Sequence, residues 1–201
     1  MPTERRTSIT DTGNMLHATA ARAGVVLLAC TVLALLLPLQ SMLAQSKRDP
    51  FTPDEVEQLR KLAYQPDDRV ELYGKLLHER LLAMQMLLKT PETSARDQQI
   101  HDRMEDIADI SDEFEDTLSD YQGRHMDMRK GLKKVIEESP HWESALKLSP
   151  SNRVYDFART EAMDATSDLH DSLVQVLAQQ EKEAAAEKLK AKEKSTEFAH
   201  P

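Results

Sequence analysis

The chain has 201 residues, of which 26 are Lys or Arg and 35 are Asp or Glu, giving a formal net charge of −9. This length fits one domain, the single Cys excludes an internal disulfide framework and multi-thiolate zinc sites, and the acidic balance argues against a nucleic-acid partner. Few glycines (5) and few aromatic residues (4%) argue against β-sandwiches and β-barrels, so the composition predicts an all-α chain.

A hydrophobic segment, residues 24–39, stands near the N-terminus between charged flanks. A run of this kind enters a membrane or the export machinery. Two interpretations are open. Residues 1–44 are a signal peptide with cleavage near Ala44, or residues 23–44 remain as a membrane anchor.

Both interpretations predict export of the helical domain, residues 45–180. After cleavage this domain is expected in the periplasm or in the medium. Without cleavage it is anchored to the inner membrane and lies outside the cytoplasm, with residues 23–44 as its only membrane contact. Met1 and Met15 are both candidate start residues, because the sequence from Met15 alone makes a conventional n-region.

The first two predicted helices follow proline signals. Thr52 is placed to act as N-cap, with Pro53 at the first helical position and Glu55 closing a capping box. The second helix begins at residues 67–68, two acids that suit a helix N-terminus. Its apolar residues cover more than one face, which predicts packing on more than one side: Val70, Leu72, Tyr73, Leu76, Leu77, Leu82, Met84, Met86, Leu87 and Leu88.

A heptad pattern runs without a break through the next segment, about 95–138. Its members alternate in steps of four and three, with two polar intrusions at Ser111 and His125: Ile100, Met104, Ile107, Ser111, Phe114, Leu118, Tyr121, His125, Met128, Leu132 and Val135. We expect one long helix here, although Gly123 and Gly131 each cost about 1 kcal/mol in a helix interior. Gly123 is where a kink would fall.

The last third of the domain contains a short segment between Pro140 and Pro150, followed by a helix. That helix carries an apolar stripe at spacings of three and four: Tyr155, Ala158, Ala162, Ala165, Leu169, Leu173 and Val176. Residues 181–201 lose the pattern, and five Glu and five Lys between 181 and 197 predict a fraying or disordered tail.

Amphipathic helices bury their stripes against one another, and the short connections at 63–67 and 89–95 favour antiparallel neighbours. The fold class predicted is therefore all-α, an elongated antiparallel helical bundle containing one long heptad-patterned helix. A homodimer through the stripe of that long helix is a further option.

Acidic residues crowd the first half of the long helix, with ten between residues 97 and 120 against Arg103 alone. A solvated acidic face is one interpretation, and a surface for divalent cations or a basic partner is the other. A rigid helix seldom wraps the roughly 6–8 oxygens that calcium prefers, so no specific metal site is expected. If a cation binds, the candidates are Asp102, Asp106, Asp109, Glu113 and Asp116.

Catalytic motifs are not evident. The Glu-x-x-His match from Glu138 to His141 contains a proline, and His78-Glu79 lacks the second His of a zincin motif. No nucleophile elbow or phosphate-binding glycine loop occurs in the sequence. We therefore predict a non-enzyme with no catalytic residues and no cofactor.

Three stretches carry a resemblance: FTPDE at 51–55, DRVELY at 68–73 and RKGLKKVIE at 129–137. Together they resemble an uncharacterised family of exported all-helical proteins from acidobacterial-type bacteria. The resemblance covers most of residues 50–180 and implies export and helices, but no activity. A fainter likeness is to periplasmic chaperones of the Spy and CpxP type, whose Leu-Thr-x-x-Gln repeats open helices. Residues 51–55 lack both that Leu and that Gln.

The function expected from these features is that of an exported, non-enzymatic helical protein whose partners are other envelope proteins. The alternative is a periplasmic metal- or stress-responsive helical protein, similar to Spy and CpxP, that uses the acidic face of residues 97–120. Calcium or zinc binding separates the two hypotheses.

Overall fold

Six helices and no strand are present across residues 48–197, the part of the chain that this computed structural model describes, with side chains described to residue 194. The candidate signal peptide or anchor, residues 1–44, lies outside the described residues, as do residues 198–201. The helices are α2 (Pro53–Lys61), α3 (Pro66–Leu88), α4 (Ser94–Gly123), α5 (Arg129–Glu138), α6 (Pro140–Lys147) and α7 (Asp156–Glu197).

Local sequence signals set most helix starts. Thr52 caps α2 as predicted, because its hydroxyl accepts from the Glu55 amide and the Glu55 carboxylate accepts from the Thr52 amide. α3 begins with Pro66 at its first position, where the missing N–H costs nothing. Thr93 caps α4 by accepting from the amide of Arg96.

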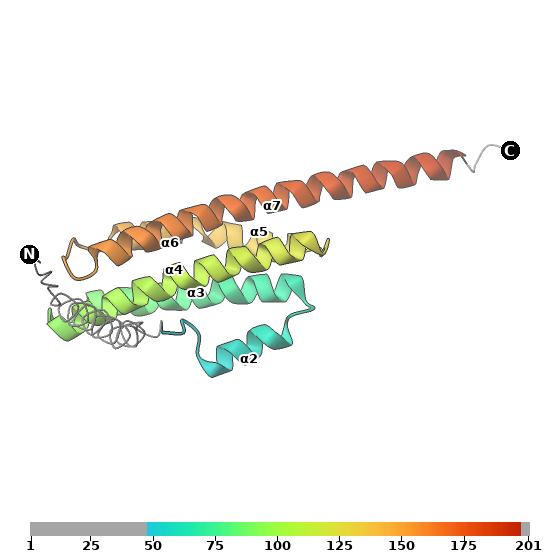
Figure 1. Cartoon of the computed structure of the whole chain (residues 1–201). Helices are drawn as coiled ribbons and strands as arrows, with labels where there is room; N and C mark the ends of the chain where they lie inside the picture. Colours follow the sequence, from blue (N-terminus) through green and yellow to red (C-terminus); the bar gives the residue numbers. More distant parts are fainter. Residues whose placement is uncertain (1–47, 198–201) are drawn as a thin grey trace, which may run out of the picture. The chain divides into compact units, whose positions relative to one another are not determined.

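Helices α3 to α7 pack against one another as a bundle, which confirms the predicted all-α class (Figure 1). α3 and α4 run antiparallel, α5 and α6 return in series, and α7 runs back in the direction of α4. α4 packs mainly against α3 and α7, and α5 likewise packs against α3 and α7. Two pairs of neighbours, α4 with α7 and α3 with α5, are therefore parallel, a feature that the short connections did not predict.

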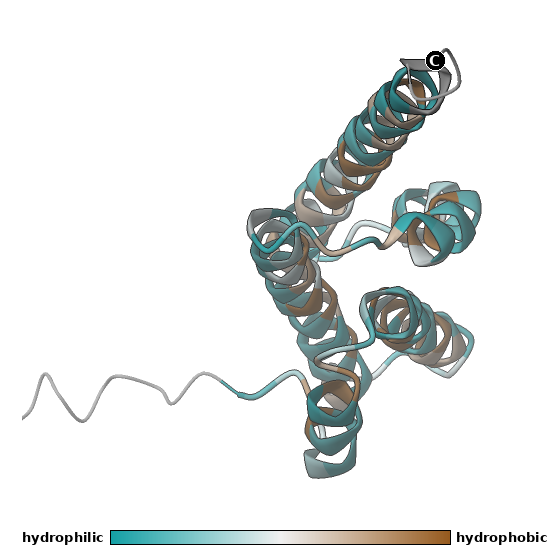
Figure 2. Ribbon diagram, turned by 90° about the vertical axis from the view of Figure 1, so that its right-hand side faces the viewer, coloured by the Kyte–Doolittle hydropathy of each residue, from teal (hydrophilic) through white to brown (hydrophobic). Residues whose placement is uncertain are grey.

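The predicted stripe of α4 and α5 forms the centre of the hydrophobic core. Every member except His125 is at most 3% exposed. Ser111 is fully buried and donates to the carbonyl of Ile107 at 2.8 Å, so its hydroxyl is satisfied within the helix. α3 and α7 of the same chain cover this stripe, so it is already occupied by intramolecular packing. Figure 2 shows hydrophobic bands along the helices and a mostly hydrophilic C-terminal part of α7.

The prediction of one long helix over 95–138 is wrong, because α4 ends at Gly123 and α5 starts at Arg129. The chain leaves α4 through His125, whose φ of 54° is left-handed. The amide of Met126 donates to the Tyr121 carbonyl at 2.9 Å, and that of His125 to Gln122 at 3.0 Å. This is a Schellman motif, which satisfies carbonyls that the helix end would leave unpaired.

The break moves α5 from the end of α4 to the side of α3. There Gly131 lies against the first turn of α3, and its amide donates to the Asp67 carboxylate at 2.7 Å. A Cβ at Gly131 would stand 2.5 Å from the Asp67 carbonyl oxygen, so only glycine permits this approach. The heptad pattern continues past the break, because Met128 and Leu132 pack into the same hydrophobic core as the stripe residues of α4.

The remaining segments follow the proline signals. Pro140 starts α6 directly after Ser139, the C-cap of α5. α7 stays helical to Glu197, so the charged tail from residue 181 continues the last helix. No helix in the described part of the chain is long and apolar enough to cross a membrane. The apolar run 24–39 lies outside that part.

Candidate functional site

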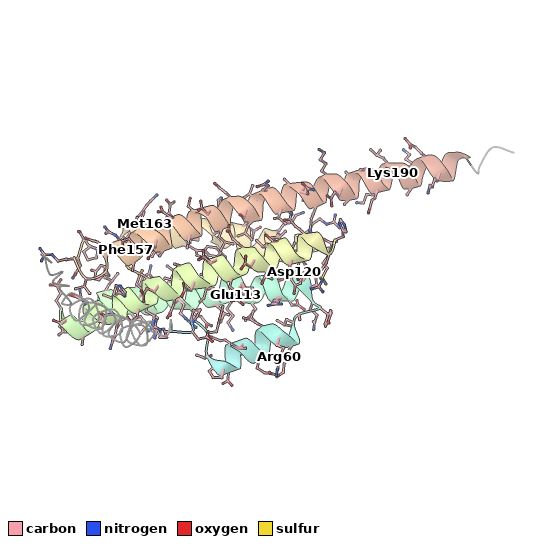
Figure 3. All side chains as sticks on the ribbon, viewed as in Figure 1. Arg60, Glu113, Asp120, Phe157, Met163 and Lys190 are labelled. Carbon is pink, nitrogen blue, oxygen red and sulfur yellow. The ribbon has the colours of Figure 1, made fainter. Side chains whose placement is uncertain are left out.

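The five acidic metal candidates do not converge on one point of α4. Asp102 and Asp109 are half-buried, Glu113 and Asp116 are exposed, and Asp106 is only 4% exposed. Glu113 lies on the side of α4 that faces α3, where it accepts from the Tyr73 hydroxyl at 3.3 Å (Figure 3). The acids are therefore not one uniformly solvated face.

Asp106 belongs instead to a cluster of charges, the Arg80 cluster, formed by Glu55, Arg80, Arg103 and Asp106, in which Arg80 and Asp106 are buried. Arg80 donates to Glu55 at 2.6 Å and lies 3.9 Å from Asp106. Arg103 donates to the other side of the cluster, reaching Asp106 at 2.9 Å. Two guanidinium groups compensate two carboxylates, which is the condition for burying such charges.

The pKa of Glu55 reflects its contacts within the Arg80 cluster. Burial raises the pKa of its carboxyl, but the hydrogen bonds from Arg80 and Thr52 and the charge of Arg80 outweigh burial. The pKa of Glu55 therefore lies below its ordinary value, and the side chain is an anion at neutral pH. The sequence contained a signal for the cluster, since Arg80 continues the spacing of Tyr73 and Leu77 on the apolar face of α3.

An aromatic group lies beside the Arg80 cluster. The ring of Tyr73 stacks on Phe114 with centroids 4.9 Å apart and meets the edge of Phe51 at 6.2 Å. Thr117 donates to the Tyr73 oxygen at 3.2 Å, and the guanidinium of Arg69 lies 5.7 Å from its ring centroid. Burial, with a contribution from the Glu113 charge, raises the pKa of Tyr73, so it remains a neutral phenol.

One group of potential metal ligands comes together within the described residues. Single ligand atoms of His101, Asp102 and Glu105 all lie within 4.8 Å of one another. All three belong to α4, and Nδ1 of His101 lies 3.5 Å from Glu105 and 3.7 Å from Asp102. Of the predicted candidates, only Asp102 is in this group.

A Ser–His pair links α7 to the junction of α5 and α6. The Ser139 hydroxyl lies 2.6 Å from Nδ1 of His170 and also donates to the Ile136 carbonyl at 3.0 Å. Ser139 is only 3% exposed, so a substrate carbonyl cannot reach its oxygen in this conformation. The pair holds α7 against the junction of α5 and α6. A nucleophilic serine must be accessible to its substrate, and the Ser139 hydroxyl is buried.

Two shallow hollows flank the turn between α4 and α5. One, about 290 Å³, lies between the turn and α7, and includes His125, Gln180 and Glu183 in its lining. The other, about 420 Å³, is lined mainly by basic residues of α5. Arg129 borders both hollows and binds Asp127 at 2.6 and 2.8 Å, which lowers the pKa of that carboxyl to about 2.

The basic hollow is electrically compensated by neighbouring helices. Lys134 reaches Glu71 of α3 at 2.7 Å, and Lys133 reaches Glu181 of α7 at 2.8 Å. These pairs fasten α5 to the helices on either side of it. Lys133 and Lys134 are therefore engaged in ion pairs between helices, and the hollow is not an open anion site.

Comparison with protein families, curated proteins and solved structures found no match to this chain.

Proposed function

We propose that this chain is an exported, non-enzymatic helical protein that acts through contacts with other proteins of the cell envelope. The apolar run 24–39 supports export, since such a run serves as a signal peptide or an anchor. We further propose that the part of α7 beyond Gln180 makes the contacts.

The observation that carries this proposal is the projection of α7. Gln180 is the last residue of α7 that holds the α4–α5 turn, through the Met126 carbonyl at 2.8 Å and the Met128 amide at 3.1 Å. Residues 185–194 are exposed throughout, and Lys190 lies on α7 well past the end of α4 (Figure 3).

This projection lacks the apolar packing that stabilises most protein helices. It carries alternating charges with small residues and Leu189, which is 63% exposed. A partner helix or groove that covers Leu189 and pairs with the charges would supply the missing packing.

Its test compares two substitutions on the same helix. Leu189→Asp changes an exposed leucine on the projection, and Val174→Asp changes an apolar residue that is 43% exposed beside the bundle. Affinity capture from envelope fractions should recover partners with wild type and Val174→Asp, and lose them with Leu189→Asp at an unchanged melting temperature. Identical recovery with all three proteins would contradict the role assigned to α7.

Localisation has its own test. Intact mass of the exported form should show a chain that begins near Gln45 if residues 1–44 are a signal peptide. A membrane-bound chain that retains the leader would instead establish the anchor. A chain found only in the cytoplasm would refute export itself.

One observation favours the alternative function, a metal- or stress-responsive protein: the grouping of His101, Asp102 and Glu105. Calorimetry with zinc and calcium decides between the two. The main proposal expects no stoichiometric binding. Micromolar, saturable binding that His101→Ala abolishes would favour the metal-responsive alternative.

A further inference from the structure

The segment that precedes α3 is attached to the bundle differently from every other part of the described chain. We call residues 49–64, which contain α2, the strap. α2 alone among the described helices makes no extensive packing contact with another helix, and Leu59 is its only buried residue. Figure 1 shows α2 lying alongside α3 and α4, joined to α3 by a short connection.

A few discrete contacts hold the strap. Arg80 donates to the Glu55 carboxylate at 2.6 Å and to the Pro50 carbonyl at 2.9 Å. Phe51 meets the Tyr73 ring edge-on. At the other end, the Tyr121 hydroxyl donates to the carbonyl of Ala63 at 3.0 Å. Both ends of the strap thus contact α3 or α4, and its two buried residues are Phe51 and Leu59.

Several contacts beneath the strap lie within the bundle itself. Asp106 lies 3.9 Å from Arg80, so one carboxylate stays near the Arg80 guanidinium when Glu55 leaves. Tyr73 retains its stack on Phe114 and its hydrogen bond from Thr117. Departure of the strap therefore leaves Arg80 beside one carboxylate and removes only Phe51 and Leu59 from the hydrophobic core.

We propose that the strap is a latch that releases from the folded bundle as one unit, with the Glu55–Arg80 pair as its catch. This inference is independent of the proposed function. Release uncovers the part of the Tyr73 ring that Phe51 contacts and one side of the Arg80 guanidinium. It also frees the 16 residues of the strap, which span about 50 Å when extended. The latch thus sets access to this face of the bundle.

Hydrogen exchange of the full chain, read by mass spectrometry, tests the proposal. Amides of α2 should exchange at least about 100-fold faster than amides in the middle of α4, corrected for intrinsic rates. Their exchange should also depend weakly on added urea, because a local opening exposes little surface. Equal protection and equal urea dependence of α2 and α4 would show that the strap opens only by global unfolding.

A matched pair of variants tests the catch. Glu55→Gln removes the charge that faces Arg80, whereas Glu57→Gln removes a charge that pairs with the exposed Arg60 and Lys61 of the same helix. Glu55→Gln should accelerate α2 exchange about tenfold and leave α4 unchanged, and Glu57→Gln should change α2 less than about twofold. Equal acceleration of α2 and α4 by Glu55→Gln, or equal effects of both variants, would overturn the latch. If Glu55→Gln fails to fold, the bundle depends on the catch and the proposal is also wrong.

Discussion

Asp106 belongs to an acidic run that the sequence suggests is solvated, yet its side chain is buried. Arg80 is a charged residue on the face of α3 that the sequence suggests is hydrophobic. Asp106 is 4% exposed and contacts two arginines. Like charges at helical spacing repel one another, so neutralising an acid in the acidic run of α4 would be expected to relieve repulsion. For Asp106 the geometry reverses this expectation, because its removal leaves Arg80 and Arg103 without their shared carboxylate.

Asp106→Asn should therefore lower the free energy of unfolding by about 2–4 kcal/mol. The control is Asp116→Asn, an exposed acid on the same helix, which should change stability by less than about 0.5 kcal/mol. Urea denaturation followed by circular dichroism measures both. Equal midpoints for the two variants would mean that the Arg80 cluster contributes nothing to stability.

Asp127 gives a pH-dependent test at one residue. Its hydrogen bonds from Arg129 lower the folded-state pKa to about 2, below the ordinary value of about 3.9 in an unfolded chain. A lowered folded pKa stabilises the fold above the unfolded pKa, and the contribution is lost as the pH falls through about 2. Asp127→Asn should lower the melting temperature by about 1–2 °C at pH 6, since the pair is largely exposed.

This difference should shrink as the pH is lowered from 5 towards 2. Scanning calorimetry of both proteins across that range checks the sign. A difference that stays constant with pH would show that the carboxylate charge is not responsible.

At the scale of elements, local chemistry explains what the sequence could and could not predict. The capping box at Thr52 and the proline starts were predictable, because each rests on residues a few positions apart. The end of α4 was not, because its left-handed residue is His125, whereas such positions usually carry Gly. A kink was expected at Gly123, two residues earlier, because glycine is unfavourable in a helix interior. That reason differs from the left-handed conformation of His125 that ends α4.

Two glycines near this break should respond in opposite directions to alanine. A Cβ at Gly123 would meet nothing within 4 Å, so Gly123→Ala should raise stability by about 0.5–1 kcal/mol through helix propensity. A Cβ at Gly131 would meet the Asp67 backbone at 2.5 Å, so Gly131→Ala should lower stability by about 1–3 kcal/mol. Thermal melts compare the two directly, and a stabilising Gly131→Ala would contradict the close packing of α5 on α3.

At the scale of the whole molecule, the burial of residues was easier to predict from the sequence than the arrangement of the helices. The stripe from Ile100 to Val135 is buried except at His125 because periodicity directly reports burial. Which helices are neighbours depends on the course of the chain after His125, which periodicity does not encode. Asp106 and Arg80 escaped prediction for a related reason, since their pairing joins α3 and α4, residues far apart in sequence.

Leu118 tests the bundle as a cooperative unit. It is 1% exposed at the centre of the core, so Leu118→Asp would bury an unpaired charge at a cost of several kcal/mol. A domain of this size has about 5–15 kcal/mol of stability, so most of the melting transition should be lost. Leu82→Asp, at a position 45% exposed on α3, should melt within a few degrees of wild type. An unchanged melting midpoint for Leu118→Asp would contradict the burial of Leu118 in the core of the bundle.

The central claim is that the chain acts through protein contacts of its projecting last helix. Site-specific photo-crosslinking in living cells tests it most directly, with the crosslinker placed at Leu189 on the projection or, as control, at Lys75 on the exposed face of α3. The account predicts discrete adducts with envelope proteins from position 189 and none of these from position 75. Absence of adducts at 189, or the same adducts from both positions, would contradict it.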